Sequence, residues 1–176
     1  MNSIKLSPRL LLLTGLILVA ALVRLLPHPP NFAPIAAMAL FGGAYFNKKV
    51  FAFAIPLAAL FLTDLFLGFH NTMWAVYLSF VVIVGLGIVM LKKKSVLRIV
   101  LASVSASVLF FIVTNFAFWA TDTLYPTTAA GLAACYTAAI PFFHNTLIGD
   151  LVFTGTLFGL FEFAKIKFPE LVRVKA

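Results

Sequence analysis

Long apolar segments, separated by short polar ones, run through the whole chain. An α-helix needs about 20 apolar residues to cross the ~30 Å hydrocarbon core of a bilayer. Six segments approach or reach this length and are predicted to be membrane-spanning helices: residues 10–26, 32–46, 50–67, 74–91, 96–119 and 141–163. The pattern therefore predicts an all-α integral membrane bundle of six helices that forms a single domain over residues 1–176.

The first two segments are joined by a stiff, proline-rich elbow. Pro27, Pro29 and Pro30 stop the first helix, because proline has no backbone N–H and disfavours a helical residue before it. Asn31 is the predicted N-cap of the second helix, and Pro34 falls in its first turn. The elbow is expected to turn the chain sharply at one membrane surface.

The second segment is short and rich in alanine and glycine. Residues 32–46 would form a helix roughly 22 Å long at 1.5 Å per residue, so its start is expected to lie below the membrane surface. Small side chains let helices approach closely. Two interpretations stay open: the small residues serve packing alone, or they make a thin helix that leaves room for a ligand.

The longest irregular stretch precedes the sixth segment. Residues 122–128 contain a Tyr-Pro turn, and residues 129–140 are predicted to form a short amphipathic helix at the outer surface. Pro141 is expected to restart the chain in the first turn of the sixth span.

Composition excludes an ordinary soluble domain. Hydrophobic residues make up 63% of the chain and charged residues 10%, whereas about a quarter of a soluble domain is charged. The net charge of +8 lies in short clusters between apolar runs, which is typical of loops beside membrane lipid and not of a nucleic-acid site. Lys5 and Arg9 precede the first apolar run, but no small-residue cleavage site follows, so this run is interpreted as a helix and not as a signal peptide.

The distribution of lysine and arginine predicts the orientation. Six spans place both termini on one side, and that side holds twelve of the 13 basic residues: Lys5, Arg9, Lys48, Lys49, Lys92, Lys93, Lys94, Arg98, Lys165, Lys167, Arg173 and Lys175. The other side holds only Arg24. Basic residues concentrate on the cytoplasmic side of membrane proteins, so both termini are predicted to be cytoplasmic, in the plasma (bacterial inner) membrane.

The outer side collects the chemically distinctive side chains. Candidates for ligand binding are Arg24, His28, Asn31, Asp64, Trp74, Asn115, Trp119, Tyr125, Cys135, Tyr136, Phe143, His144 and Asn145. This asymmetry is the main indication of function.

The two carboxylates near this side each have a structural alternative. Asp64 either pairs with Arg24 or contacts a ligand, since a buried carboxylate costs roughly 2.5–3.5 kcal/mol at mid-membrane and needs a partner or a water-filled cavity. Asp150 lies deeper and either bonds to Thr154 or another helix, or binds a ligand or an ion.

The remaining candidates also have simpler explanations. The three histidines, His28, His70 and His144, are typical interfacial residues. No two of them have the spacing of metal ligands, so neither a metal nor a cofactor is expected. Trp74, Trp119 and Tyr125 are either interface anchors or walls of a pocket for a flat organic ligand. Cys135, the one cysteine, is interpreted as a small buried residue. No nucleophile and base have catalytic spacing, so the chain is not expected to be an enzyme.

Three stretches carry a family resemblance: RLLPHPPNFAPIAAMALFGGAYF, PLAALFLTDLFLGFH and YPTTAAGLAACYTAAIPFFHNTLIGDL. They resemble a family of uncharacterised bacterial membrane proteins, which in size and topology is similar to the substrate-binding S-components of energy-coupling-factor (ECF) vitamin transporters. The resemblance implies a ligand cavity open to the outside beneath the first, third and fifth loops. It also implies a transmembrane partner coupled to ATPase subunits, although the AxxxA motif that S-components often carry for it is absent from the first span.

Three functions follow as hypotheses. The first is S-component-like uptake of a vitamin or other small micronutrient, with or without an energising module. It predicts a cavity lined by Asp64, Asn115, Trp119, Tyr136, His144 and Asn145. The second is a small membrane enzyme. The third is an assembly or scaffold subunit, which predicts a filled interior and an exposed patch of small residues on the second helix.

Overall fold

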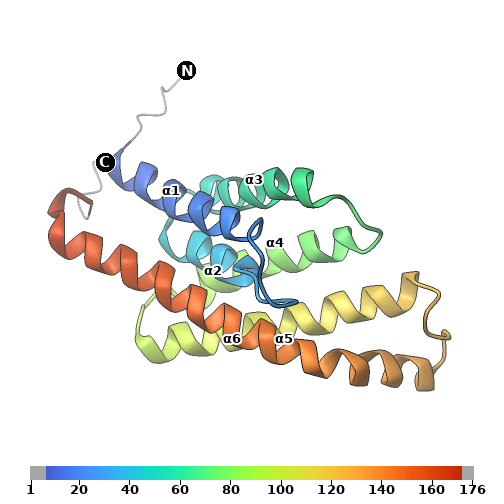
Figure 1. Ribbon diagram of the computed structural model, residues 1–176. Coiled ribbons are helices and arrows are strands. Elements are labelled where there is room, and N and C mark those ends of the chain that lie inside the picture. Colours follow the sequence, from blue (N-terminus) through green and yellow to red (C-terminus); the bar gives the residue numbers. More distant parts are fainter. Residues whose placement is uncertain (1–6, 172–176) are drawn as a thin grey trace.

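The computed structural model describes residues 7–171, which form six α-helices and one short 3-10 helix with no strand (Figure 1). The elements are α1 (Pro8–Val23), α2 (Ile35–Tyr45), α3 (Lys49–Leu67), α4 (Met73–Met90), α5 (Val96–Thr121), α6 (Ala129–Lys167) and η1 (Pro169–Leu171). The all-α prediction is confirmed for this part of the chain. Lys5, Arg173 and Lys175, used above to predict orientation, lie outside the described residues.

Four helices are long and apolar enough to cross a membrane. These are α3, α4, α5 and α6, whereas α1 and α2 are apolar but shorter. The helices run alternately in opposite directions, so that the ends of α1, α3 and α5 meet the starts of α2, α4 and α6 at one end of the bundle (Figure 1). This architecture is that of a membrane-type helical bundle.

Helix α2 lies at the centre and contacts all five other α-helices. Its residues 36–43 are all buried. A Cβ atom on Gly43 would lie 2.3 Å from the Val84 carbonyl oxygen, and one on Gly87 would lie 2.7 Å from that of Leu40. The backbones of α2 and α4 therefore touch, so the small residues do serve close packing. A scaffold subunit had predicted an exposed patch of small residues on α2, whereas residues 36–43 are buried.

The elbow differs from its prediction. Helix α2 begins at Ile35 and not at residue 32, because Pro34 disfavours a helical residue before it. Asn31 is not an N-cap: it adopts a left-handed conformation with φ 62° inside the turn that the Phe32 N–H closes by donating to the Pro29 carbonyl oxygen. Helix α1 ends at Val23, three residues before the predicted residue 26. The N–H groups of residues 24–26 then donate to the carbonyl oxygens three residues earlier, as in a 3-10 turn.

Helix α6 is the main correction. The segment 129–140 is not a separate surface helix but the first part of one 39-residue helix that passes through Pro141 without a break. Proline removes one backbone bond, and the alanine-rich turns on its N-terminal side have high helix propensity and remain helical. The end of α6 lies four residues beyond the predicted residue 163, and every remaining predicted boundary is within two residues of the observed one.

Distant parts of the chain meet at the end of the bundle where α1 begins and α6 ends. Arg9 donates hydrogen bonds to the carbonyl oxygens of Leu171 (3.2 Å) and Tyr45 (3.0 Å). The Tyr45 hydroxyl donates to Glu162, which also pairs with Lys165 one turn later on α6. The start of α1 is thereby tied to the end of α6, so both ends of the described chain lie at the same end of the bundle.

Candidate ligand site

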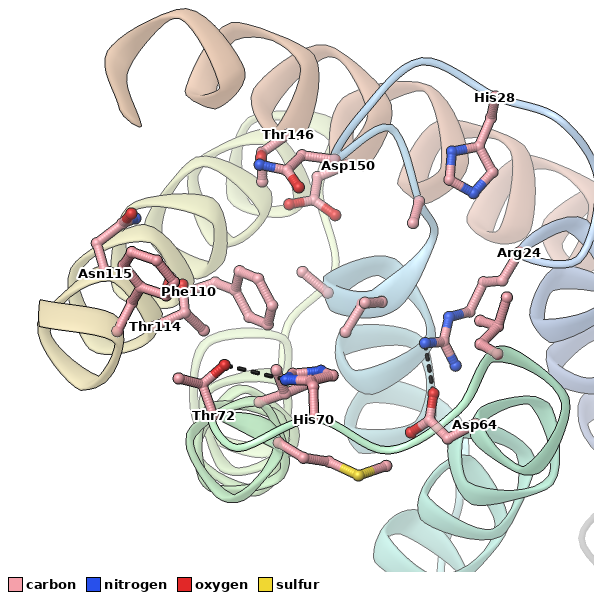
Figure 2. A pocket seen from close by; sticks show the side chains of 18 residues that line it. Arg24, His28, Asp64, His70, Thr72, Phe110, Thr114, Asn115, Thr146 and Asp150 are labelled. Atoms are coloured by element: carbon pink, nitrogen blue, oxygen red, sulfur yellow. Dashed lines mark hydrogen bonds and ion pairs between the residues drawn. The ribbon is translucent and has the colours of Figure 1, made fainter. Parts of the chain in front are cut away.

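A cavity of about 430 Å³ lies where the ends of α1 and α3 meet the starts of α2 and α4 (Figure 2). Helices α5 and α6 complete its wall. The lining residues are Arg24, His28, Asn31, Ala33, Ile35, Ala36, Asp64, Leu67, His70, Thr72, Met73, Val76, Phe110, Thr114, Asn115, Phe118, Thr146 and Asp150. This volume is within the usual range of small-molecule sites.

One wall of the cavity is held by a buried ion pair. Arg24 Nη2 donates to Asp64 Oδ1 at 2.6 Å, and Arg24 Nη1 donates to the Leu60 carbonyl oxygen at 3.2 Å and to the Thr63 hydroxyl. The Tyr77 hydroxyl donates to the second carboxylate oxygen of Asp64 at 2.8 Å. The predicted pairing of Arg24 with Asp64 is confirmed, and both charged groups are satisfied within the protein.

The opposite wall holds Asp150, which is only 2% exposed. Ser107 on α5 donates to its Oδ2 at 2.7 Å, and the backbone N–H of Ala36 at the start of α2 lies close enough to interact with it. The predicted bond to another helix is therefore present. Thr154 instead lies 3.3 Å from the Ser103 hydroxyl. Within residues 7–171, no basic side chain pairs with Asp150.

The proline elbow and the α3–α4 loop form the rim. His28 Nδ1 lies 3.0 Å from the Pro29 carbonyl oxygen, and His70 Nδ1 lies 3.0 Å from the Thr72 hydroxyl. Both histidines are exposed. The first and third loops thus border the cavity as the family resemblance implied, while the fifth loop contributes no lining residue.

Five of the thirteen candidate residues line the cavity: Arg24, His28, Asn31, Asp64 and Asn115. The other eight do not: Trp74, Trp119, Tyr125, Cys135, Tyr136, Phe143, His144 and Asn145. Of the six residues expected to line it, Asp64 and Asn115 do so, and Trp119, Tyr136, His144 and Asn145 do not. Trp74 is 53% exposed, and Asn145 donates to the Pro30 carbonyl oxygen at 3.0 Å.

Several of these eight side chains hold the α5–α6 hairpin together instead. The Tyr136 hydroxyl donates to the Ile112 carbonyl oxygen at 2.7 Å, and Trp119 Nε1 donates to that of Pro126 at 3.0 Å. The Cys135 thiol is buried and 3.7 Å from a carbonyl oxygen of α5, as expected for a small structural residue. The continuous α6 lies along α5 and turns Tyr136 and Cys135 toward the α5 backbone, while Trp119 on α5 bonds to the loop between the two helices.

Most of the α5 and α6 wall was not predicted: Asn115 and Asp150 had been considered for ligand contact, whereas Phe110, Thr114, Phe118 and Thr146 had not. Phe110, Thr114 and Phe118 recur at four-residue intervals on one face of α5, and Thr146 and Asp150 do so on α6. The spacing is visible in the sequence, but every packed helix has such rows, so it does not single out a site.

The donor set does not form a metal centre. Among the described residues, no three histidine, cysteine, aspartate or glutamate side chains are grouped to hold an ion. The cavity combines one satisfied ion pair, one buried carboxylate and apolar and aromatic walls, and small-molecule sites share this mixture of many apolar and few polar groups.

Comparison with known families covers nearly the whole chain. Residues 4–171 match a protein family described as a family of unknown function, DUF6580. The chain belongs to this family. No curated protein and no solved structure matches it. The DUF6580 match contains no link to ECF S-components, so that relationship stays a prediction.

Proposed function

We propose that this protein is a multi-pass protein of the bacterial inner membrane that captures a small organic molecule from the outer face for uptake. The observation that carries the proposal is the cavity at one end of the bundle, lined from every helix or its adjoining loop. Its size, apolar walls and few polar groups are those of a ligand site.

The short central helix supports this proposal. Helix α2 has 11 residues and spans only about 16 Å of a ~30 Å hydrocarbon core. Five helices surround it, so it does not need to reach both membrane surfaces by itself. The cavity occupies the space beyond its N-terminus, where Ile35 and Ala36 form part of the floor. A short, centrally buried helix thus creates the room for a ligand.

The charge distribution supports the proposed orientation. The cavity end of the described chain holds a single basic residue, Arg24, while the opposite end holds nine: Arg9, Lys48, Lys49, Lys92, Lys93, Lys94, Arg98, Lys165 and Lys167. By the positive-inside rule, the cavity opens to the outside and both termini are cytoplasmic. In this proposal all six helices cross the membrane core, α2 only in part.

Binding without catalysis is part of the proposal. The Thr72 hydroxyl lies beside a base, His70, but this pair is at the rim of the cavity. Arg24 and Asp64 engage each other, and Cys135 lies outside the lining. Uptake is proposed from the sequence-based resemblance in size and topology to S-components, either with an energy-coupling transmembrane and ATPase module or alone.

Native mass spectrometry of protein extracted with its own lipids tests the proposal. The wild type is expected to carry a bound small molecule in a one-to-one complex. Thr114→Trp should abolish that adduct by filling the cavity, whereas Thr137→Trp should keep it. The two threonines are matched, because each donates its hydroxyl to the carbonyl oxygen four residues earlier and only Thr114 lines the cavity. A wild type without a bound molecule, or an adduct that survives Thr114→Trp, would contradict the proposal.

A further inference from the structure

The charges that line the cavity are not balanced. Its charged lining residues are Arg24, Asp64 and Asp150, with the two histidines at the rim. Arg24 and Asp64 neutralise each other at 2.6 Å. Asp150 remains as the one carboxylate of the lining without a basic partner among the described residues.

The surroundings of Asp150 stabilise a carboxylate only in part. Ser107 supplies one hydrogen bond, and the N-terminus of α2, next to Ala36, carries a partial positive charge of roughly half a unit. These groups offset part of the negative charge but add no counter-ion. A buried ionised carboxylate normally requires a full partner or a water-filled space. The space beside Asp150 is the cavity itself, into which its carboxyl group points from the side opposite Arg24 (Figure 2).

We propose that the molecule held in this cavity carries a positively charged nitrogen, which pairs with the Asp150 carboxylate. This inference rests on the proposed function and names the charge class of its ligand. The missing counter-ion of Asp150 is then supplied by the ligand. The Coulomb attraction between the two charges is stronger in this cavity than in bulk water, because the effective dielectric constant is lower there.

The aromatic wall fits the same class of ligand. Phe110 and Phe118 line the cavity on α5, and Figure 2 shows the Phe110 ring directed into it between Asp150 and Thr72. A cationic nitrogen is attracted to the face of an aromatic ring, and a flat organic ring packs against one. An organic cation therefore matches both the carboxylate and the apolar wall.

Other charge classes fit less well. An anion would find no lysine and no free arginine among the described lining residues, because the Arg24 guanidinium is already bonded to Asp64, Thr63 and the Leu60 carbonyl oxygen. The two histidines lie at the rim, away from Asp150 (Figure 2). A bare metal ion would find Asp150 without further ligands of the required kind in the described part of the chain. A neutral molecule would leave the carboxylate without a counter-ion.

Three small probes of similar shape and different charge test the inference. Benzylamine is a cation near neutral pH, benzyl alcohol is neutral and benzoate is an anion. Binding to the full-length protein in lipid nanodiscs is measured by saturation-transfer NMR titration. Benzylamine is expected to bind at least about tenfold more tightly than either of the others, the size of a single charge-assisted contact. This comparison uses the wild type alone and does not depend on any variant folding.

A matched pair of variants locates the effect. Asp150→Asn should lower the affinity for benzylamine by at least about tenfold and leave that for benzyl alcohol unchanged. Asp122→Asn removes the same charge at the same end of the bundle, in the α5–α6 loop and outside the cavity, and should leave both affinities unchanged. Thermal unfolding of both variants checks that they are folded.

The inference is overturned if benzyl alcohol or benzoate binds as tightly as benzylamine, if no probe binds, or if Asp150→Asn keeps the affinity for benzylamine. These outcomes leave the proposed function standing so long as native mass spectrometry shows a bound molecule that Thr114→Trp removes. A wild type that carries no bound molecule in native mass spectrometry would instead contradict the proposed function.

Discussion

Arg24 and Asp64 form an ion pair at 2.6 Å that joins the end of α1 to the last turn of α3, and each side chain is less than one-tenth exposed. The pair connects two helices that border the cavity and leaves neither charge free for a ligand. Its role is therefore to shape the site, and its removal is expected to affect stability first.

Breaking this ion pair should be costly, while removing both partners should be much less so. Asp64→Leu leaves the Arg24 guanidinium buried without its counter-ion and should lower the free energy of unfolding by about 3–5 kcal/mol. The double variant Arg24→Met/Asp64→Leu removes both charges and should recover a large part of that loss. Denaturation in mild detergent measures both. If the loss of stability in the double variant equals the sum of the losses in Asp64→Leu and Arg24→Met alone, the pair is not coupled.

The contact between α2 and α4 should tolerate no added methyl group. Gly87→Ala places a Cβ atom 2.7 Å from the Leu40 carbonyl oxygen, and this overpacking should destabilise the protein by about 1–3 kcal/mol. Gly85→Ala, on the same helix, meets nothing within 4 Å and should be neutral or stabilising by up to about 1 kcal/mol. Thermal unfolding of the two variants side by side checks the difference. Equal melting temperatures would show that the two helices are farther apart.

The two ends of the bundle should be labelled from opposite sides of the membrane. In a Cys135→Ala background, Asp122→Cys and Lys93→Cys each place one thiol in an exposed connection at opposite ends of α5. Asp122→Cys should react with a membrane-impermeant maleimide in intact cells, because the α5–α6 loop is proposed to face outward. Lys93→Cys should react only after permeabilisation. The reverse pattern would invert the proposed orientation.

Helix α6 should behave as one rod across Pro141. Spin labels at Ala133 and Val152, both exposed on α6, are 19 residues apart, and a continuous helix puts their backbones about 28 Å apart. Pulsed electron resonance in nanodiscs measures this separation. A broad or much shorter distance would indicate a hinge at the proline, as the sequence alone had indicated. A label pair at Val100 and Phe116, within the proline-free α5, gives the reference for an unbroken helix.

The sequence alone predicted the features that depend on local chemistry. Runs of apolar residues mark helices, and prolines often limit them. The first five helices and the elbow between Arg24 and Pro34 were therefore found within a few residues, whereas the start of the sixth helix was misplaced at Pro141. The approach of Arg24 to Asp64 was also predicted, because both charges lie near the same end of apolar segments and each needs a partner there.

Only the tertiary structure decided which side chains face the cavity. In a soluble protein the polar side of a helix marks its outer face, but here lipid-facing and core-facing positions are both apolar, so periodicity carries little contrast. Tyr136 and Trp119 were therefore expected at the site yet bond to the backbone of the α5–α6 hairpin, while Phe110 and Asp150 were placed on the cavity wall by helix packing. The sequence by itself determined that the chain needs partners for its few buried charges. Packing around the short α2 decided that Arg24 supplies the partner for Asp64 and that Asp150 faces a cavity with no basic side chain beside it.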